Sequence, residues 1–116
     1  MAVVNPFFHN GGNMEKRKNL DAAIHAVDEV CKKLLKKMDY RIELQICVQV
    51  VSEMYGMLEG ENADTQKFLR LLEEMLYGMT QKDEVFLLDV LRFGLKPELE
   101  RMNSELEINE PEGIHE

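Results

Sequence analysis

Residues 83–102 read DEVFLLDVLRFGLKPELERM and form the most regular run of the chain. On a helical wheel Asp89, Arg92 and Lys96 share one narrow polar arc with Val85, and apolar side chains fill nearly all of the remaining circumference. A helix that is apolar on so many sides has to be covered on more than one of them. The sequence therefore predicts that this helix lies at the centre of a bundle or in a subunit interface.

The acids and the proline of this run have structural explanations. Asp83 is favourable at a helix start, near the positive end of the helix dipole. Asp89 and Arg92 are three residues apart and can pair on the helix surface. Pro97 removes a backbone donor and disfavours helical geometry at the residue before it, so we expect a kink or a restart there. None of these residues requires a functional site.

Two stretches upstream are predicted to be helical. Over residues 15–38 apolar side chains recur at steps of three and four, and a group of lysines lies on the opposite face. Residues 42–50, IELQICVQV, alternate strictly, which is typical of a half-buried strand. Their polar residues also gather in one arc of a helix, and no other stretch offers a convincing strand partner. We expect a helix over residues 40–58, with a strand as the alternative.

A third helix is expected over residues 65–77, after a break at GENADT. Asp64 or Thr65 is a plausible N-cap. Gly78 suits the C-terminal cap, and Thr80 can open the last helix with Asp83 three residues later, an approximate capping box.

These elements predict one all-α domain over residues 14–103. It is an antiparallel bundle of four helices, or of five if Pro97 divides the last. Residues 1–13 are expected to form an irregular arm because Asn-Pro and Gly-Gly interrupt them, and residues 104–116, with five glutamates, an acidic flexible tail. Residues 11–14 could be encoded by GGAGGTAATATG, which resembles a bacterial ribosome-binding site followed by a start codon, so Met14 is an alternative expected start.

The charge is strongly uneven along the chain. The net charge is −8, yet residues 14–41 hold eight basic against five acidic residues, a local excess of +3. The run Lys32–Lys37 could contact nucleic acid or an anionic surface, but no aromatic residues interleave with its lysines. A solvated helix face explains it more simply, and an acidic protein is a poor polyanion binder.

Metal and catalytic chemistry find little support in the sequence. The weak metal candidates are Asp21, His25, Asp28 and Glu29 on the first predicted helix. The three histidines of the chain do not cluster, and a solvated helix face accounts for these residues. No phosphate-binding glycine loop and no Ser–His–Asp arrangement stands out, so we expect neither an enzyme nor a cofactor.

The two cysteines are expected to be reduced. Cys31 and Cys47 are nearly equidistant from Asp39, so an antiparallel hairpin places them on adjacent helices at a similar height. Two cysteines are no disulfide framework, which favours the cytoplasm. No apolar stretch is long enough to span a membrane, and the start MAVVNPFFHN lacks the pattern of a secretory signal.

Protein partners are the favoured ligands. Eight methionines are many for this length, and flexible thioethers form adaptable binding surfaces as well as filling cores. The partner-binding candidates are Met54, Met57, Met75, Met79, Phe93 and Met102, and the five methionines lie at predicted helix ends, where we expect them to be semi-exposed.

Residues 83–102 also resemble the C-terminal pattern D-x-V-L-L-A-D-L-L-E-Y-E-L-x-P-x-L-E-x-W of small, largely uncharacterised helical proteins of Gram-positive bacteria. The matching positions are Asp83, Val85, Leu87, Asp89, Leu91, Leu95, Pro97, Leu99 and Glu100, with Phe93 at the tyrosine. Arg92 and Gly94 stand where the pattern has acids, and Met102 where it has tryptophan. The resemblance implies a flagellar or surface-modification setting and no known chemistry.

We therefore expect a cytoplasmic, non-catalytic interaction protein: an adaptor, a chaperone-like factor or an assembly factor. The predicted helices over 40–58 and 83–102 are apolar well beyond a half-turn, so a homodimer or a stable heteromer is expected. The alternatives are a binder of a small apolar ligand or a metal within the bundle, and a regulator that contacts nucleic acid through the Lys32–Lys37 face.

Overall fold

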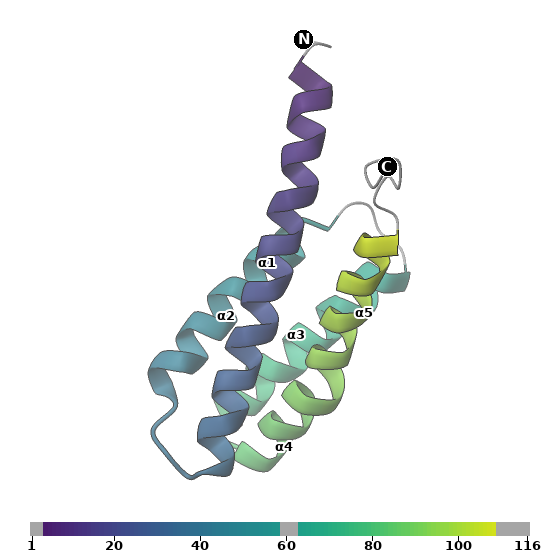
Figure 1. Cartoon of the computed structure of the whole chain (residues 1–116). Helices are drawn as coiled ribbons and strands as arrows, with labels where there is room; N and C mark the ends of the chain where they lie inside the picture. The colour runs from purple at the N-terminus through teal and green to yellow at the C-terminus, as the bar shows by residue number, and fades with distance from the viewer. Residues whose placement is uncertain (1–3, 59–62, 109–116) are drawn as a thin grey trace.

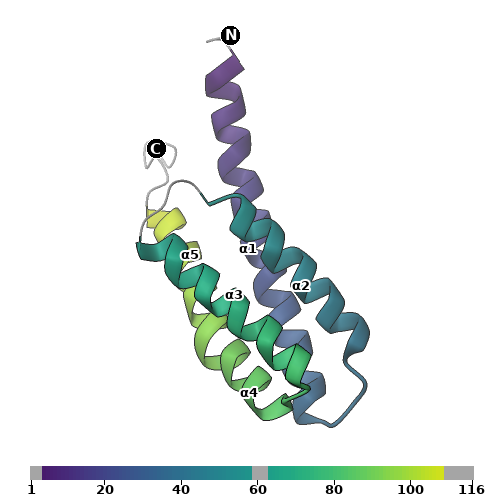
Figure 2. The same cartoon turned by 180° about the vertical axis from the view of Figure 1, so that it is seen from behind.

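The computed structural model describes residues 4–58 and 63–108, and over these residues the chain is helical with short connections. The elements are α1 (Val4–Leu35), α2 (Arg41–Gly56), α3 (Ala63–Gln81), α4 (Glu84–Asp89), the π-helical segment η1 (Val90–Leu95) and α5 (Lys96–Ile108). The helices run antiparallel in sequence order, with α4, η1 and α5 as one helical course (Figures 1 and 2). The described ranges contain no strand, which confirms the all-α bundle and makes the strand alternative for 42–50 wrong.

Both ends of the chain are more helical than predicted. α1 begins at Val4 and extends beyond the bundle in Figure 1, so an irregular arm is wrong for residues 4–13. Pro6 lies in the first turn of α1, where its missing N–H is not needed. α5 continues to Ile108, so the flexible tail predicted from residue 104 is wrong as far as that residue, because Leu106 packs against the core. The rest of the predicted tail, residues 109–116, lies outside the described residues.

α1 ends in a Schellman motif, the common αL termination of a helix. The backbone N–H of Met38 donates to the Lys33 carbonyl at 2.9 Å, and that of Lys37 donates to the Leu34 carbonyl at 3.2 Å. Lys37 has the left-handed backbone conformation that the motif requires, with φ of 58°. The connection to α2 then closes over residues 36–40.

The α3–α4 connection repeats this geometry and corrects two predictions. Lys82 takes the left-handed position with φ of 55°, and the Asp83 N–H donates to the Gly78 carbonyl at 3.0 Å. Gly78 is therefore no C-terminal cap: it lies inside α3, where an added Cβ would come 3.2 Å from Phe86 Cδ2. Thr80 does not open a helix either, since it lies in α3 and its hydroxyl donates to the Leu76 carbonyl.

Asp83 is the N-cap of α4. Its Oδ1 accepts a hydrogen bond from the Phe86 N–H at 3.1 Å, and its backbone is extended. The side chain thus satisfies one of the free donors at the helix start. The last helix accordingly has its N-cap at Asp83, three residues later than the expected cap Thr80.

The π-helical turn before Pro97 accommodates the proline ring within the helix. The N–H of Lys96 donates to the carbonyl of Leu91, five residues earlier, and Pro97 follows in the first turn of α5. A proline ring inside an α-helix would meet the carbonyl four residues before it, and the wider turn avoids that contact. The helix therefore continues through Pro97 with a π segment before it. Gly94 lets this segment approach α3, because a Cβ there would lie 2.6 Å from Leu71 Cδ2.

The core fills the space between these helices along their whole overlap. Tyr55 of α2 stacks on buried Phe68 of α3, with ring centroids 6.2 Å apart. The largest fully buried side chains are Phe68, Met54, Met75, Leu87, Leu91, Leu95 and Leu99.

We call the end of the bundle that carries connections 36–40 and 82–83 the turn end. The opposite end, where α2 finishes and α3 begins, is the distal end (Figure 2).

Candidate protein-interaction surface

Among residues 15–58 and 64–106, whose side-chain exposure the structure describes, the large exposed apolar side chains all lie in the half of the bundle nearer the turn end. They are Leu35, Met38, Ile42, Ile46, Leu76, Tyr77, Val85 and Phe93. Each lies within about three helical turns of connection 36–40 or 82–83 along its own helix. Val85 is 74% exposed and Ile42 is 70% exposed, so these side chains are not marginal cases. We call this set the turn-end apolar surface.

Part of this surface borders a groove between α1 and η1. Leu35 lies on its α1 wall and Phe93 on its η1 wall, and Arg92 holds its guanidinium carbon 5.2 Å from the centre of the Phe93 ring. At the groove Lys96 Nζ lies 2.8 Å from Asp28 Oδ1, and this hydrogen bond raises the pKa of Lys96. The groove thus combines exposed apolar walls with cations.

A second hollow lies beside the α3–α4 turn. Tyr77 and Val85 line it together with Glu84. The Tyr77 ring meets the Phe86 ring edge-on at 5.9 Å, which fixes its position on the surface. The Tyr40 hydroxyl donates to Glu84 Oε2 at 2.8 Å and so ties the α1–α2 connection to α4.

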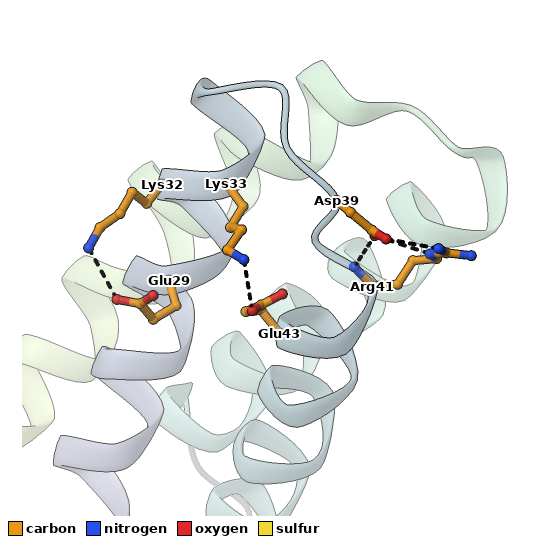
Figure 3. Close-up of polar contacts among 6 residues, drawn as sticks. All are labelled: Glu29, Lys32, Lys33, Asp39, Arg41 and Glu43. Carbon is orange, nitrogen blue, oxygen red and sulfur yellow. Dashed lines mark hydrogen bonds and ion pairs between the residues drawn. The ribbon is translucent and has the colours of Figure 1, made fainter.

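Glutamates pair with two lysines of the predicted lysine face (Figure 3). Lys32 Nζ lies 3.3 Å from Glu29 Oε2, and Lys33 Nζ lies 3.1 Å from Glu43 Oε2 on α2. Beyond them Arg41 folds onto Asp39, and its hydrogen bonds lower the pKa of Asp39 to about 2. These pairs reduce the positive charge that a polyanion could use.

The distal end carries an ionic network between α3 and α5. The Glu98 side chain is 2% exposed, and its oxygens lie 2.6 Å from Arg101 Nη2 and 3.3 Å from Lys67 Nζ. Arg101 also pairs with Asp64 and Glu105, which joins α3 to α5. The hydrogen bond from Arg101 holds the pKa of Glu98 below its usual value, with Lys67 acting in the same direction.

A cavity of about 230 Å³ adjoins this network. Its apolar lining residues are Leu20, Met54, Leu58, Met102 and Leu106. Lys16, Asp64, Thr65, Arg101 and Glu105 supply polar groups. The arrangement can hold a small apolar molecule with a polar end.

The predicted partner-binding methionines do not gather on the turn-end apolar surface. Met54 is 1% and Met75 0% exposed, so the expectation that they lie semi-exposed is wrong. Both fall on the inward face of their helices, where a flexible thioether fills the core. Met57, Met79 and Met102 are partly buried against that core.

Phe93 is the one candidate that is largely exposed, at 69%. The sequence reasoning missed Ile42 and Val85 as surface residues. A signal existed for Val85, since it shares the polar arc of its helix with Asp89 and Arg92. An apolar residue within a polar arc indicates exposure.

Three of the four weak metal candidates make polar contacts with other residues, Asp28 through its pair with Lys96. Asp21 Oδ1 accepts a hydrogen bond from Asn103 Nδ2 at 3.5 Å, and Glu29 pairs with Lys32. In the described ranges no group of three or more His, Cys, Asp or Glu residues could hold a metal ion.

Both cysteine thiols are buried and unbonded. Burial raises the pKa of Cys31 to about 11 and that of Cys47 to about 12. Each thiol therefore stays protonated near neutral pH and is a poor nucleophile.

Comparison of the chain with protein-family models, with curated proteins and with solved structures finds no match. The resemblance of residues 83–102 to helical proteins of Gram-positive bacteria thus stays a prediction. Within the described residues, no helix combines the length and the apolar character that crossing a membrane requires.

Proposed function

We propose that this chain is a non-catalytic helical interaction protein, an adaptor or assembly factor, that binds other proteins through its turn-end apolar surface. One observation carries the proposal: among residues 15–58 and 64–106, whose side-chain exposure the structure describes, eight large apolar side chains are exposed, and all lie in the half of the bundle nearer the turn end. Single exposed apolar residues are common on monomers, but their concentration on one part of a surface is typical of interaction sites.

The composition of this surface supports protein binding. It contains Tyr77 and Phe93, with Arg92 beside the phenylalanine ring. Aromatic residues and arginine are enriched at the energetic centres of protein interfaces. The buried, unbonded thiols of Cys31 and Cys47 support a reducing compartment such as the cytoplasm.

The test is co-purification from the native host with two matched triple variants. One carries Ile42→Ser, Val85→Ser and Phe93→Ser on the turn-end apolar surface. The control carries Gln66→Ser, Arg70→Ser and Glu73→Ser, which are exposed on α3 and leave the net charge unchanged. Circular dichroism and urea denaturation establish that both fold.

We expect wild type and the control triple to retain the same proteins, and the apolar triple to lose them. A second copy of the chain counts among these proteins, and light scattering coupled to size exclusion detects it. Equal retention by both triples contradicts the proposal. So does a wild-type protein that stays monomeric at micromolar concentration and retains nothing.

The distal cavity favours a second candidate, the binding of a small apolar ligand. Its mixture of apolar and polar lining residues suits a ligand with one polar end. Native mass spectrometry of the protein purified from its host is the test, and a bound small molecule that Met102→Trp displaces is the expected result. A mass equal to that of the bare chain contradicts this candidate.

A further inference from the structure

We infer that the α1–η1 groove binds an acidic amphipathic helix of a partner protein, which places an aliphatic side chain between Leu35 and Phe93 and a carboxylate on Arg92. The inference rests on the proposed function and names the chemistry of the partner. It is supported by the charges of the groove, by the place of Arg92 beside Phe93, and by a lining that comes from two adjacent helical segments.

The groove offers one cation more than its acids neutralise. Its charged lining residues are Asp28, Glu29, Lys32, Arg92 and Lys96. Both acids are already engaged, because Lys96 pairs with Asp28 and Lys32 with Glu29. Arg92 makes no ion pair with any described residue, so the pair with Asp89 that the sequence allows does not form, and its contact is with the Phe93 ring. A carboxylate from outside would complete its hydrogen bonds.

Arg92 and Phe93 form one binding element, because the guanidinium packs on the ring. The guanidinium lies 5.2 Å from the ring centre, within the range of a cation–π contact, and the ring is 69% exposed. Stacking holds the planar guanidinium in place, so less side-chain freedom is lost when it binds a carboxylate with two hydrogen bonds. An apolar contact on Phe93 and a charged contact on Arg92 can therefore form side by side.

The shape of the groove favours a helix as the occupant. α1 and η1 supply its two walls, with Leu35 on one and Phe93 on the other. An apolar stripe at helical spacing fits between two such walls, as in other helix-in-groove complexes. The segment Val90–Leu95 that presents Arg92 and Phe93 is π-helical, a geometry that is often found at functional sites.

A second copy of the chain fits the groove less well. A symmetric dimer would place one groove on another, so that the two Arg92 side chains and their neighbouring lysines would face one another. Like charges across an interface disfavour that arrangement. A different chain with acids around an apolar stripe meets no such repulsion.

Three designed helical peptides test the partner chemistry. They share one leucine stripe in a glutamine background and carry glutamate, glutamine or lysine only at the positions that flank the stripe. Binding to the full-length chain is measured by fluorescence anisotropy at low and at high salt. The protein variants are Arg92→Gln and Phe93→Ser, with Arg70→Gln on α3 as the control for loss of an exposed arginine.

We expect the glutamate peptide to bind wild type and the control about tenfold or more tighter than the glutamine peptide, as expected for a charge-assisted contact. This preference should shrink at high salt. Arg92→Gln should abolish the preference while leaving the glutamine peptide unaffected, and Phe93→Ser should weaken both peptides. These results together support the inference.

Other outcomes overturn it. A lysine peptide that binds as tightly as the glutamate peptide excludes an acidic partner, and so does a preference that survives in Arg92→Gln. If wild type binds all three peptides equally tightly and Phe93→Ser weakens them all, the acidic partner is excluded while apolar docking at the turn end stands. A dimer that Phe93→Ser dissociates identifies a second copy as the occupant. Absence of binding by all three peptides also rejects this inference, whereas the triple variants decide the proposed function separately.

Discussion

At the distal end the carboxylate of Glu98 is almost fully buried and two cations hold it, whereas at the turn end Phe93 is 69% exposed. Both residues belong to the same helical course, α4–η1–α5. Burying a charge is costly unless it is paired and hydrogen-bonded, and the distal network supplies those partners. Leaving a phenylalanine in water forgoes the free energy that its burial would give. This helical course therefore pairs its buried charge toward the distal end and leaves an apolar side chain in contact with water toward the turn end.

The largest expected effect separates two neighbours on η1. Leu91 is 0% exposed, so Leu91→Ala should lower the free energy of unfolding by about 2–5 kcal/mol. Phe93→Ala should change it by less than about 0.5 kcal/mol, because the exposed ring contributes little to the core. Urea denaturation of both variants is the measurement. Equal losses would mean that Phe93 is part of the core, and the contrast between the ends would fail.

The second prediction concerns the distal network. Glu98→Gln keeps the shape of the side chain but removes its charge, and should cost about 1.5–3 kcal/mol at neutral pH. Because the pKa of Glu98 is lowered in the folded state, its stabilisation is present above the unfolded pKa of about 4.3. It is lost as the pH falls through the folded-state pKa.

The difference between wild type and Glu98→Gln should therefore shrink in acid. Urea denaturation over the range from neutral pH to about pH 3 tests this. A difference that is constant with pH would indicate that Glu98 acts through packing alone and that the distal end holds no saturated charge network.

The smallest effect is at the turn end. Lys37 has a left-handed backbone conformation, with φ of 58°, which is unfavourable for a residue with a Cβ. Lys37→Gly should therefore raise the free energy of unfolding by roughly 0.5–1 kcal/mol. Lys36→Gly, one residue earlier and without positive φ, should lower it. Thermal denaturation of the pair is the measurement, and a fall for both would contradict the Schellman geometry of this connection.

The sequence was sufficient for the helices and insufficient for their surfaces. The helix over 42–50 could be predicted despite its alternating pattern. Its polar residues gather in one arc of a helix, and a lone strand would leave its backbone groups unpaired. Gly78 and Thr80 were misread because a Schellman motif can place a lysine at the left-handed position, and only the backbone reveals that Lys82 does so. Met54 and Met75 were misread because helical periodicity does not tell which sides of a helix are covered.

The turn-end apolar surface was equally hidden in the sequence. The apolar excess of the helices predicted that something must cover them, but not where. The position of this surface depends on the tertiary structure, because connections 36–40 and 82–83 bring Leu35, Ile42, Tyr77 and Val85 to the same end of the bundle. Phe93 alone was named in advance.

The central claim is that proteins bind at the turn end and not at the distal end. Site-specific photocrosslinking in the native host tests it most directly, with benzoylphenylalanine placed at Phe93 or Val85 on the turn end and at Gln66 on α3 near the distal end. All three positions are exposed, so none of the substitutions should perturb the core. The account predicts discrete protein adducts at Phe93 and Val85 and none at Gln66. Adducts at Gln66 with bare chain at the other two positions would contradict it.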